Sequence, residues 1–207
     1  MTETARTYAI VLYELGIPED MVREAVKLLK ENPELWSEQA YVRLNVEKYG
    51  GMICSTWFDR PLSVAGRLLV KSEEGITVKL VQIDKDLLML PSLAIHMNRD
   101  INTGYDYHAQ KDMLPLYGMG TKGEKESFMD RIAREADVKE EDILGSDLYV
   151  YNRMPGSVWG SEDEFISIGK LDDLECVYSS MTSFLSAEEH DRIPVHCVYD
   201  NEEVGSS

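Results

Sequence analysis

The chain has 207 residues, which is enough for one or two domains with a proper apolar core. Its formal net charge of −17 disfavours nucleic acid and anionic membranes as partners, because like charges repel. Three scattered cysteines without CxxC spacing argue against a disulfide framework and against a thiolate zinc site. The chain starts with polar residues and no apolar run reaches membrane-spanning length, so we expect a cytoplasmic protein.

The first 36 residues predict a helical hairpin. Apolar residues recur at helical spacing in residues 8–15, Gly16-Ile17-Pro18 ends that helix, and Asn32-Pro33 ends a second one. This segment resembles the N-terminal helices of the delta subunit of F-type ATP synthases, in residues 4–9, 12–15 and 34–35. The resemblance implies a fused or misjoined N-terminus, because nothing later in the chain continues that family.

From Ala40 the apolar pattern has the period of strands. Residues 41–47 alternate apolar and polar, and a second strand is expected at 52–57. Residues 62–71 and 76–83 predict two further strands joined by a polar loop. Consecutive antiparallel strands of this kind form a small sandwich or barrel.

The middle of the chain offers one candidate functional residue, His96. It ends an apolar run that starts at Leu87, where a histidine is either a satisfied boundary residue or an active one. Residues 98–123 are rich in polar residues and glycine and predict a long exposed loop.

Helical and strand patterns then alternate. Residues 124–136 predict an amphipathic helix, residues 138–144 a short helical turn, and residues 147–151 a strand. Pro155-Gly156-Ser157 marks an expected boundary. We therefore expect three parts: a helical segment at 1–36, a β-rich domain at 37–155 and a partial α/β domain at 156–207.

In the last part, an Asp pair precedes a helix predicted at 174–185. Asp172 is either a candidate ligand or an ordinary helix N-cap. A buried strand is expected at residues 193–199, and the acidic cluster Asp200-Asn201-Glu202-Glu203 follows it. An ordinary helix-to-strand connection brings Asp172 and the two glutamates to one end of this unit.

Ionised carboxylates leave water only when they are paired or bind a cation. The closing cluster therefore has two interpretations. One is a cation site in which one Glu is a ligand and its neighbour takes a proton from water. The other is an acidic turn at a strand end, closed by Gly205.

Seven stretches of the chain together resemble the M18 family of metalloaminopeptidases, the aspartyl aminopeptidases. They occur in the family's order and with similar separations across about residues 40–207. They are Tyr49-Gly50-Gly51, Ser55-Thr56-Trp57-Phe58-Asp59-Arg60, Leu62-Ser63-Val64-Ala65-Gly66-Arg67, Pro91-Ser92-Leu93-Ala94-Ile95-His96, Asp163-Glu164-Phe165-Ile166, Lys170-Leu171-Asp172-Asp173-Leu174 and the residues 199–206.

This resemblance implies an α/β catalytic domain interrupted by a β-rich dimerisation domain, in a large homo-oligomer. It implies that Asp172 bridges two zinc ions, that Glu203 is a ligand to one zinc, and that Glu202 is the general base. His96 would reach a neighbouring subunit's active site and steady the substrate carbonyl. The implied substrates are peptides with an N-terminal Asp or Glu.

The family's first His ligand, in a His-x-Asp-Ser-Pro stretch before Tyr49, has no counterpart here, and its later Asp and His ligands fall beyond Ser207. Two carboxylates do not hold a zinc pair tightly, so we expect this polypeptide to be inactive alone, as an incomplete fragment. The alternative is a non-catalytic dimerisation or interaction module. Lys170 and Asp173 stand where the family often has Arg and Asn, changes that spare Asp172.

Overall fold

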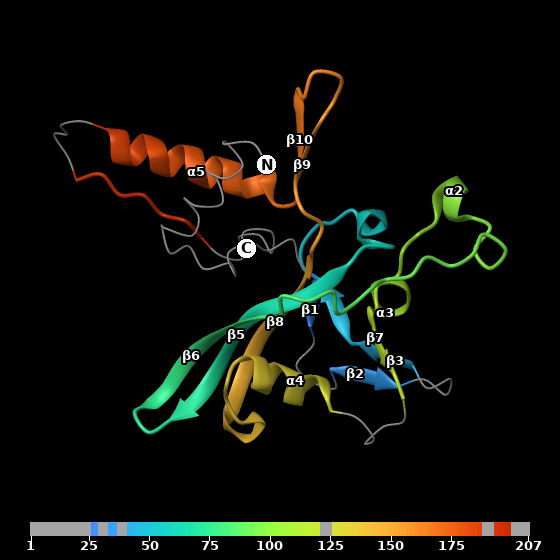
Figure 1. The fold of residues 1–207 in the computed structure, drawn as a ribbon, viewed down its shortest axis with the longest axis horizontal. Helices are drawn as coiled ribbons and strands as arrows, with labels where there is room; N and C mark the ends of the chain where they lie inside the picture. The colour runs from blue at the N-terminus through green and yellow to red at the C-terminus, as the bar shows by residue number, and fades with distance from the viewer. Residues whose placement is uncertain (1–25, 29–32, 37–40, 121–125, 188–192, 200–207) are drawn as a thin grey trace. The chain divides into compact units, whose positions relative to one another are not determined.

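The computed structural model describes residues 26–28, 33–36, 41–120, 126–187 and 193–199. They fall into two compact units, one within Glu24–Arg153 and the other from Met154 onward (Figure 1). In the described part of the chain, every helix is too short or too polar to cross a bilayer.

The elements of the first unit are β1 (Val26–Leu28), β2 (Glu34–Trp36), β3 (Tyr41–Leu44), β4 (Val46–Lys48), η2 (Cys54–Trp57), β5 (Leu62–Ser72), β6 (Gly75–Gln82), α2 (Ile101–Gly104), α3 (Ala109–Asp112), β7 (Leu116–Met119), α4 (Phe128–Glu135), η3 (Glu140–Asp142) and β8 (Ile143–Asn152). Those of the second are β9 (Ser157–Trp159), β10 (Phe165–Ser167) and α5 (Leu171–Ser186).

A five-stranded antiparallel sheet, in the order β4-β1-β8-β5-β6, forms the frame of the first unit. Strands β5 and β6 make a long hairpin (Figure 1) whose register ends at Ser72 opposite Gly75. Gly66 lies where β5 passes close to β8. A Cβ added there would sit 2.0 Å from the carbonyl oxygen of Asp147, so only glycine fits this crossing.

The core lies on one face of this sheet. The alternating residues Leu62, Val64 and Leu68 of β5 are fully buried, as expected when strand side chains point to opposite faces. Helix α4 covers that face with Phe128 and Ile132, which are also fully buried. The predicted helix, strand pair and late strand are thus confirmed as α4, the β5–β6 hairpin and β8.

Helix α4 begins with a capping box. The Ser127 hydroxyl accepts a hydrogen bond from the amide of Asp130 at 3.0 Å, and the Asp130 carboxylate accepts one from the Ser127 amide at 3.1 Å. The amide of Phe128 donates to the Glu34 carboxylate from β2. Negative side chains at this end also suit the helix dipole. The bond between Phe128 and Glu34 joins α4 to the small sheet β2-β3-β7.

Three local predictions for the first unit are wrong. Residues 26–28, expected in a helix, form strand β1, because the backbone pairs with β4 and β8 on either side. Residues 52–57, expected as a strand, contain the short helix η2. The predicted loop 98–123 includes the short helices α2 and α3 and strand β7. The first predicted helix, at 8–15, lies outside the described residues.

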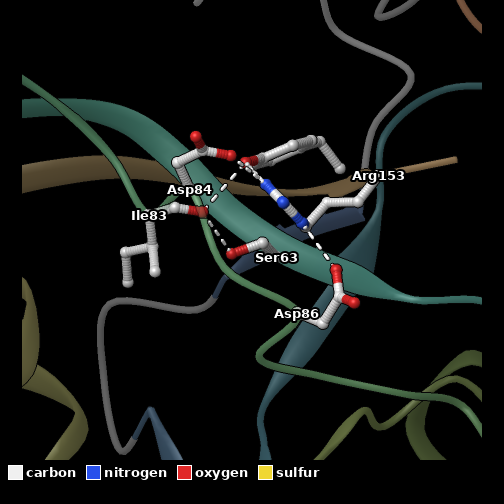
Figure 2. Close-up of polar contacts among 6 residues, drawn as sticks. Ser63, Ile83, Asp84, Asp86 and Arg153 are labelled. Carbon is white, nitrogen blue, oxygen red and sulfur yellow. Dashed lines mark hydrogen bonds and ion pairs between the residues drawn. The ribbon is translucent and has the colours of Figure 1, made fainter. Parts of the chain in front are cut away.

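Arg153, the last residue of the first unit, is the centre of a network of polar contacts (Figure 2). The guanidinium donates to Asp86 at 2.7 Å and to Asp84 at 2.5 Å. These hydrogen bonds, that with Asp84 foremost, raise the pKa of Arg153. Nearby, the buried Ser63 hydroxyl donates to the carbonyl of Ile83 at 2.7 Å. The network holds the end of β8 against the segment that follows β6.

The second unit contains a short hairpin and a long helix. Strands β9 and β10 pair antiparallel, and the rings of Trp159 and Phe165 lie 4.8 Å apart between centroids. Helix α5 follows. Together the units are of the mixed α/β class, as predicted at that level; the finer division into domains at 1–36, 37–155 and 156–207 stays a prediction.

The buried strand predicted at residues 193–199 is not present. These residues have no strand conformation, and Ile193 and Tyr199 are 91% and 79% exposed. A strand needs a neighbouring strand to take up its backbone hydrogen bonds, and none in the described part of the chain lies beside this segment. Ile193, Val195 and Tyr199 therefore remain in solvent here.

Candidate functional site

Asp172 lies at the start of α5, in a backbone that departs from the helix. Its φ of −82° and ψ of 113° are extended, the peptide bond to Asp173 is cis, and Lys170 before it has a φ of 73°. Both aspartates are exposed. The N-cap position of α5 is Lys170, which makes no side-chain capping bond, and among the described residues the Asp172 carboxylate has no hydrogen-bond partner, so the N-cap alternative is not supported. The exposed side chain is available to a ligand.

The other two carboxylates of the predicted site, Glu202 and Glu203, lie outside the described residues. Their approach to Asp172, on which the expected cation site depends, therefore stays a prediction. The segment before them does meet α5: the Ser180 hydroxyl and the His196 Nε2 lie 2.9 Å apart, and the rings of Phe184 and His196 lie 5.8 Å apart between centroids. Residues 193–199 and α5 are thus in contact at His196.

Zinc binds carboxylate oxygens, and the exposed Asp172 is chemically suited to it. Within residues 26–28, 33–36, 41–120, 126–187 and 193–199, however, no group of three His, Cys, Asp or Glu side chains is placed to hold a metal ion. The described residues thus include a type of donor that zinc accepts, but too few such donors lie together to hold the ion. No catalytic step can be derived through a metal from these residues.

His96 lies on an exposed turn of the first unit. The amide of Met97 donates to the carbonyl of Ala94 at 2.8 Å, which closes the turn. The neighbours Leu93, Ile95 and Met97 are also exposed, with Met97 at 75%. The turn thus presents one imidazole among apolar side chains to whatever approaches this surface.

The turn is anchored by Asp59, a residue that the sequence analysis included in a stretch without giving it a role. Its carboxylate accepts a hydrogen bond from the amide of Ser92 at 2.8 Å. This bond to the backbone lowers the pKa of Asp59. Asp59 itself adopts a φ of 57°, in the left-handed region that Asp and Asn tolerate best. Nothing in the residues around Asp59 signals this partner, which lies 33 positions along the chain.

Residues 25–207 match the family described as "Aminopeptidase I zinc metalloprotease (M18)". The chain is 45% identical over 183 residues to the probable M18 family aminopeptidase 2 of Clostridium novyi and 43% identical to that of Clostridium acetobutylicum. Each match covers 86% of this chain and 42% of the relative. The chain therefore spans about two fifths of the length of these curated relatives.

Among solved structures, the chain is similar to one in the cryo-EM structure of the Ape4 and Nbr1 complex, with a TM-score of 0.69, 28% identity, and coverage of 77% of this chain and 34% of that one. For Chaetomium thermophilum mApe1 the TM-score is 0.67 with 29% identity, covering 79% and 40%. For the S. cerevisiae mApe1 dodecamer it is 0.60 with 25% identity, covering 78% and 36%.

Proposed function

The chain belongs to the M18 family of zinc metalloproteases, and from that membership we propose that it forms part of a zinc-dependent aminopeptidase that removes N-terminal Asp or Glu from peptides. The observation that carries the proposal is the match of residues 25–207 to the family. The exposed Asp172, without a hydrogen-bond partner among the described residues, supports it. The acidic preference rests on the resemblance of the sequence to the aspartyl aminopeptidases. A cytoplasmic location without nucleic-acid or membrane partners belongs to the same proposal.

In this proposal Asp172 and Glu203 would hold the zinc, with Asp172 shared between two ions and Glu203 a ligand to one of them. When bound, two zinc ions polarise the scissile carbonyl and make water a better nucleophile. Glu202 takes a proton from the attacking water and returns it to the leaving amine. His96, on its exposed turn, steadies the substrate carbonyl in a neighbouring subunit. The outward position of that turn supports such a role.

The test places the part of this chain that matches the Clostridium novyi relative into that relative, in exchange for the corresponding stretch. We expect the chimera to hydrolyse a glutamyl or aspartyl anilide. Asp172→Asn in the chimera removes a metal-bridging carboxylate, so the rate falls by at least about a hundredfold, as when a critical transition-state contact is lost. Glu175→Gln is the matched control, because it removes one exposed carboxylate from the same helix and keeps the rate.

A chimera in which Asp172→Asn hydrolyses the anilide as fast as its parent contradicts the assignment of Asp172. The 207-residue chain alone is tested separately. We expect it to hold less than stoichiometric zinc by elemental analysis and to show no turnover. Stoichiometric zinc with turnover would overturn the prediction that it is incomplete.

We also propose that the β-rich unit mediates self-association. The face of the β5–β6 hairpin opposite the core carries exposed aliphatic side chains at Leu69, Ile76, Val78 and Leu80, of which Ile76 is 67% exposed. A group of exposed aliphatic side chains on one face is typical of an interface. The similar S. cerevisiae mApe1 structure is a dodecamer, which supports self-association.

The oligomeric state tests this surface. Val78→Glu places a charge on the apolar face and is expected to lower the molar mass measured by light scattering after size-exclusion chromatography. Lys79→Glu, one residue along on the opposite face, is the matched control and keeps the mass. An equal mass for both variants rejects this face as the interface.

A non-catalytic interaction module is the second candidate function. One observation favours it: the exposed apolar face of the hairpin. The chimera separates the two candidates, because a module's residues do not support hydrolysis in the relative.

A further inference from the structure

A cavity of about 550 Å³ opens in the β-rich unit, lined only by residues of that unit. Its walls come from strand β3, the segment after η2, the stretch 91–98 and the segment around α3. Cavities of about 300–1,000 Å³ are the usual size of small-ligand sites. Phe58 and residues 91–93 belong to stretches that carry the family resemblance, but none of the roles proposed for Asp172, Glu202, Glu203 and His96 uses this cavity.

One side of the cavity is aromatic. The rings of Phe58 and Tyr107 lie 5.2 Å apart between centroids, and those of Tyr105 and Tyr107 lie 5.1 Å apart in an edge-to-face arrangement. The buried Leu114 adds an aliphatic contact. Aromatic and aliphatic walls favour a ligand with an apolar or aromatic body, since rings pack well edge-to-face or offset.

Two cationic side chains, Arg43 from β3 and Lys111 from α3, also line the cavity. In the described part of the chain neither has an ion-pair partner. Two cations without ion-pair partners in the lining of one cavity are unexpected in a chain with a net charge of −17. Two cations beside apolar walls attract an anion, and the arginine fork matches a carboxylate in two-point contact.

The acid among the lining residues, Asp112, accepts hydrogen bonds from Tyr105 and His108. Its Oδ1 accepts a hydrogen bond from the Tyr105 hydroxyl at 2.9 Å, and its Oδ2 accepts one from the His108 amide at 2.7 Å. Both carboxylate oxygens therefore have donors, and Asp112 forms an ion pair with neither Arg43 nor Lys111. With two positive charges and one negative charge among its lining residues, the cavity carries a net charge of +1, which suits a monoanion better than a multiply charged phosphate.

We propose that this cavity is a binding site for a monocarboxylate attached to an apolar or aromatic body, with Arg43 and Lys111 on the carboxylate and the Phe58–Tyr107 wall on the body. A free aryl carboxylic acid and the C-terminal residue of a peptide share this chemistry. The site is independent of the metal chemistry proposed above.

Calorimetric titration of the 207-residue chain tests the site with two pairs of probes. The first pair is N-acetylphenylalanine and its uncharged amide. The second is acetyl-Ala-Ala-Phe with a free or an amidated C-terminus, in which the acetyl group prevents removal of the first residue by an aminopeptidase. We expect each carboxylate to bind at least about tenfold more tightly than its amide, as a charge-assisted hydrogen bond predicts. Tighter binding by the peptide of the second pair identifies a peptide terminus as the source.

The variant Arg43→Gln with Lys111→Gln is expected to remove the preference for the carboxylate. Lys71→Gln with Lys79→Gln removes the same charge from exposed positions of the hairpin away from the cavity and keeps the preference. Equal binding of carboxylate and amide by the unchanged chain overturns the proposal. Dissociation constants above about 10 mM for both carboxylates also overturn it. The same holds if the Arg43→Gln, Lys111→Gln variant keeps the preference for the carboxylate, or if phenyl phosphate binds more tightly than N-acetylphenylalanine.

Discussion

The two units of the chain differ in how much apolar surface they bury for themselves. The first has an extended core of buried side chains, among them Leu62, Val64 and Phe128. In the described part of the second, Leu174 is the one buried apolar residue, whereas Trp159 and Ile166 are more than half exposed. The first unit thus has the burial that stabilises a fold, since hydrophobic burial scales with area removed from water. The second unit has apolar side chains along its strands, but most of them are exposed.

The largest expected effect tests that difference directly. Phe128→Ala removes a fully buried ring from the core and leaves a cavity, so we expect the free energy of unfolding to fall by about 3–5 kcal/mol. Ile166→Ala in β10 removes an exposed side chain and is expected to change stability by less than about 0.5 kcal/mol. Urea unfolding followed by tryptophan fluorescence measures both, because Trp57 lies in the first unit and Trp159 in the second. Equal losses in the two variants contradict the contrast between the units.

A second variant tests the tight crossing of β5 and β8. Gly66→Ala forces a Cβ against the Asp147 carbonyl, and we expect a loss of about 1–3 kcal/mol, as for other overpacked sites. Gly51→Ala is the control, because a Cβ there meets nothing within 4 Å. The same urea titration compares them, and a Gly66→Ala chain as stable as the control rules out this constraint.

The cap of α4 is expected to contribute less. Ser127→Ala removes the hydroxyl that accepts from the Asp130 amide, and we expect a loss of about 1 kcal/mol. Ser180→Ala, at an exposed position within α5, serves as a comparison in the second unit and should leave the Trp57 transition unchanged. A Ser127→Ala chain with an unchanged midpoint shows that the capping box adds nothing measurable.

The smallest effect concerns pH and the turn that carries His96. The Ser92 amide lowers the pKa of Asp59 below its ordinary 3.8, so the unfolded state binds the proton more readily than the folded one. The stabilisation is therefore complete above the unfolded pKa and is lost as pH falls through the folded pKa. Because the group is exposed, we expect less than about 1 kcal/mol.

Asp59→Asn tests this contribution through hydrogen exchange of the Ser92 amide. We expect faster exchange in the variant near neutral pH, and a difference that shrinks in acid as the wild-type carboxylate is protonated. Asp106→Asn, on an exposed loop, is the control. A difference that persists at a pH below both pKa values contradicts the electrostatic origin.

Much of the first unit follows from local pattern. The β5–β6 hairpin could be predicted because alternating apolar residues flank a polar loop with Gly75, and α4 because Phe128 and Ile132 recur at helical spacing. Strand β1 could not, since Val26–Leu28 also fits a helical face and only pairing with β4 and β8 selects the strand. The cavity likewise joins Arg43 and Lys111, which are far apart in the sequence.

By itself, the sequence determined the acidic charge, the family resemblance, the hairpin and helix of the first unit, and Asp172 as a candidate ligand at the start of α5. Local spacing decides those features because neighbouring residues alone create an amphipathic face or a turn. Only the tertiary structure decided that β1 is a strand, that Asp59 holds the His96 turn, and that residues 193–199 form no strand. Each of these depends on a hydrogen-bond partner distant in sequence, and a pattern of residue types does not specify whether that partner is within reach.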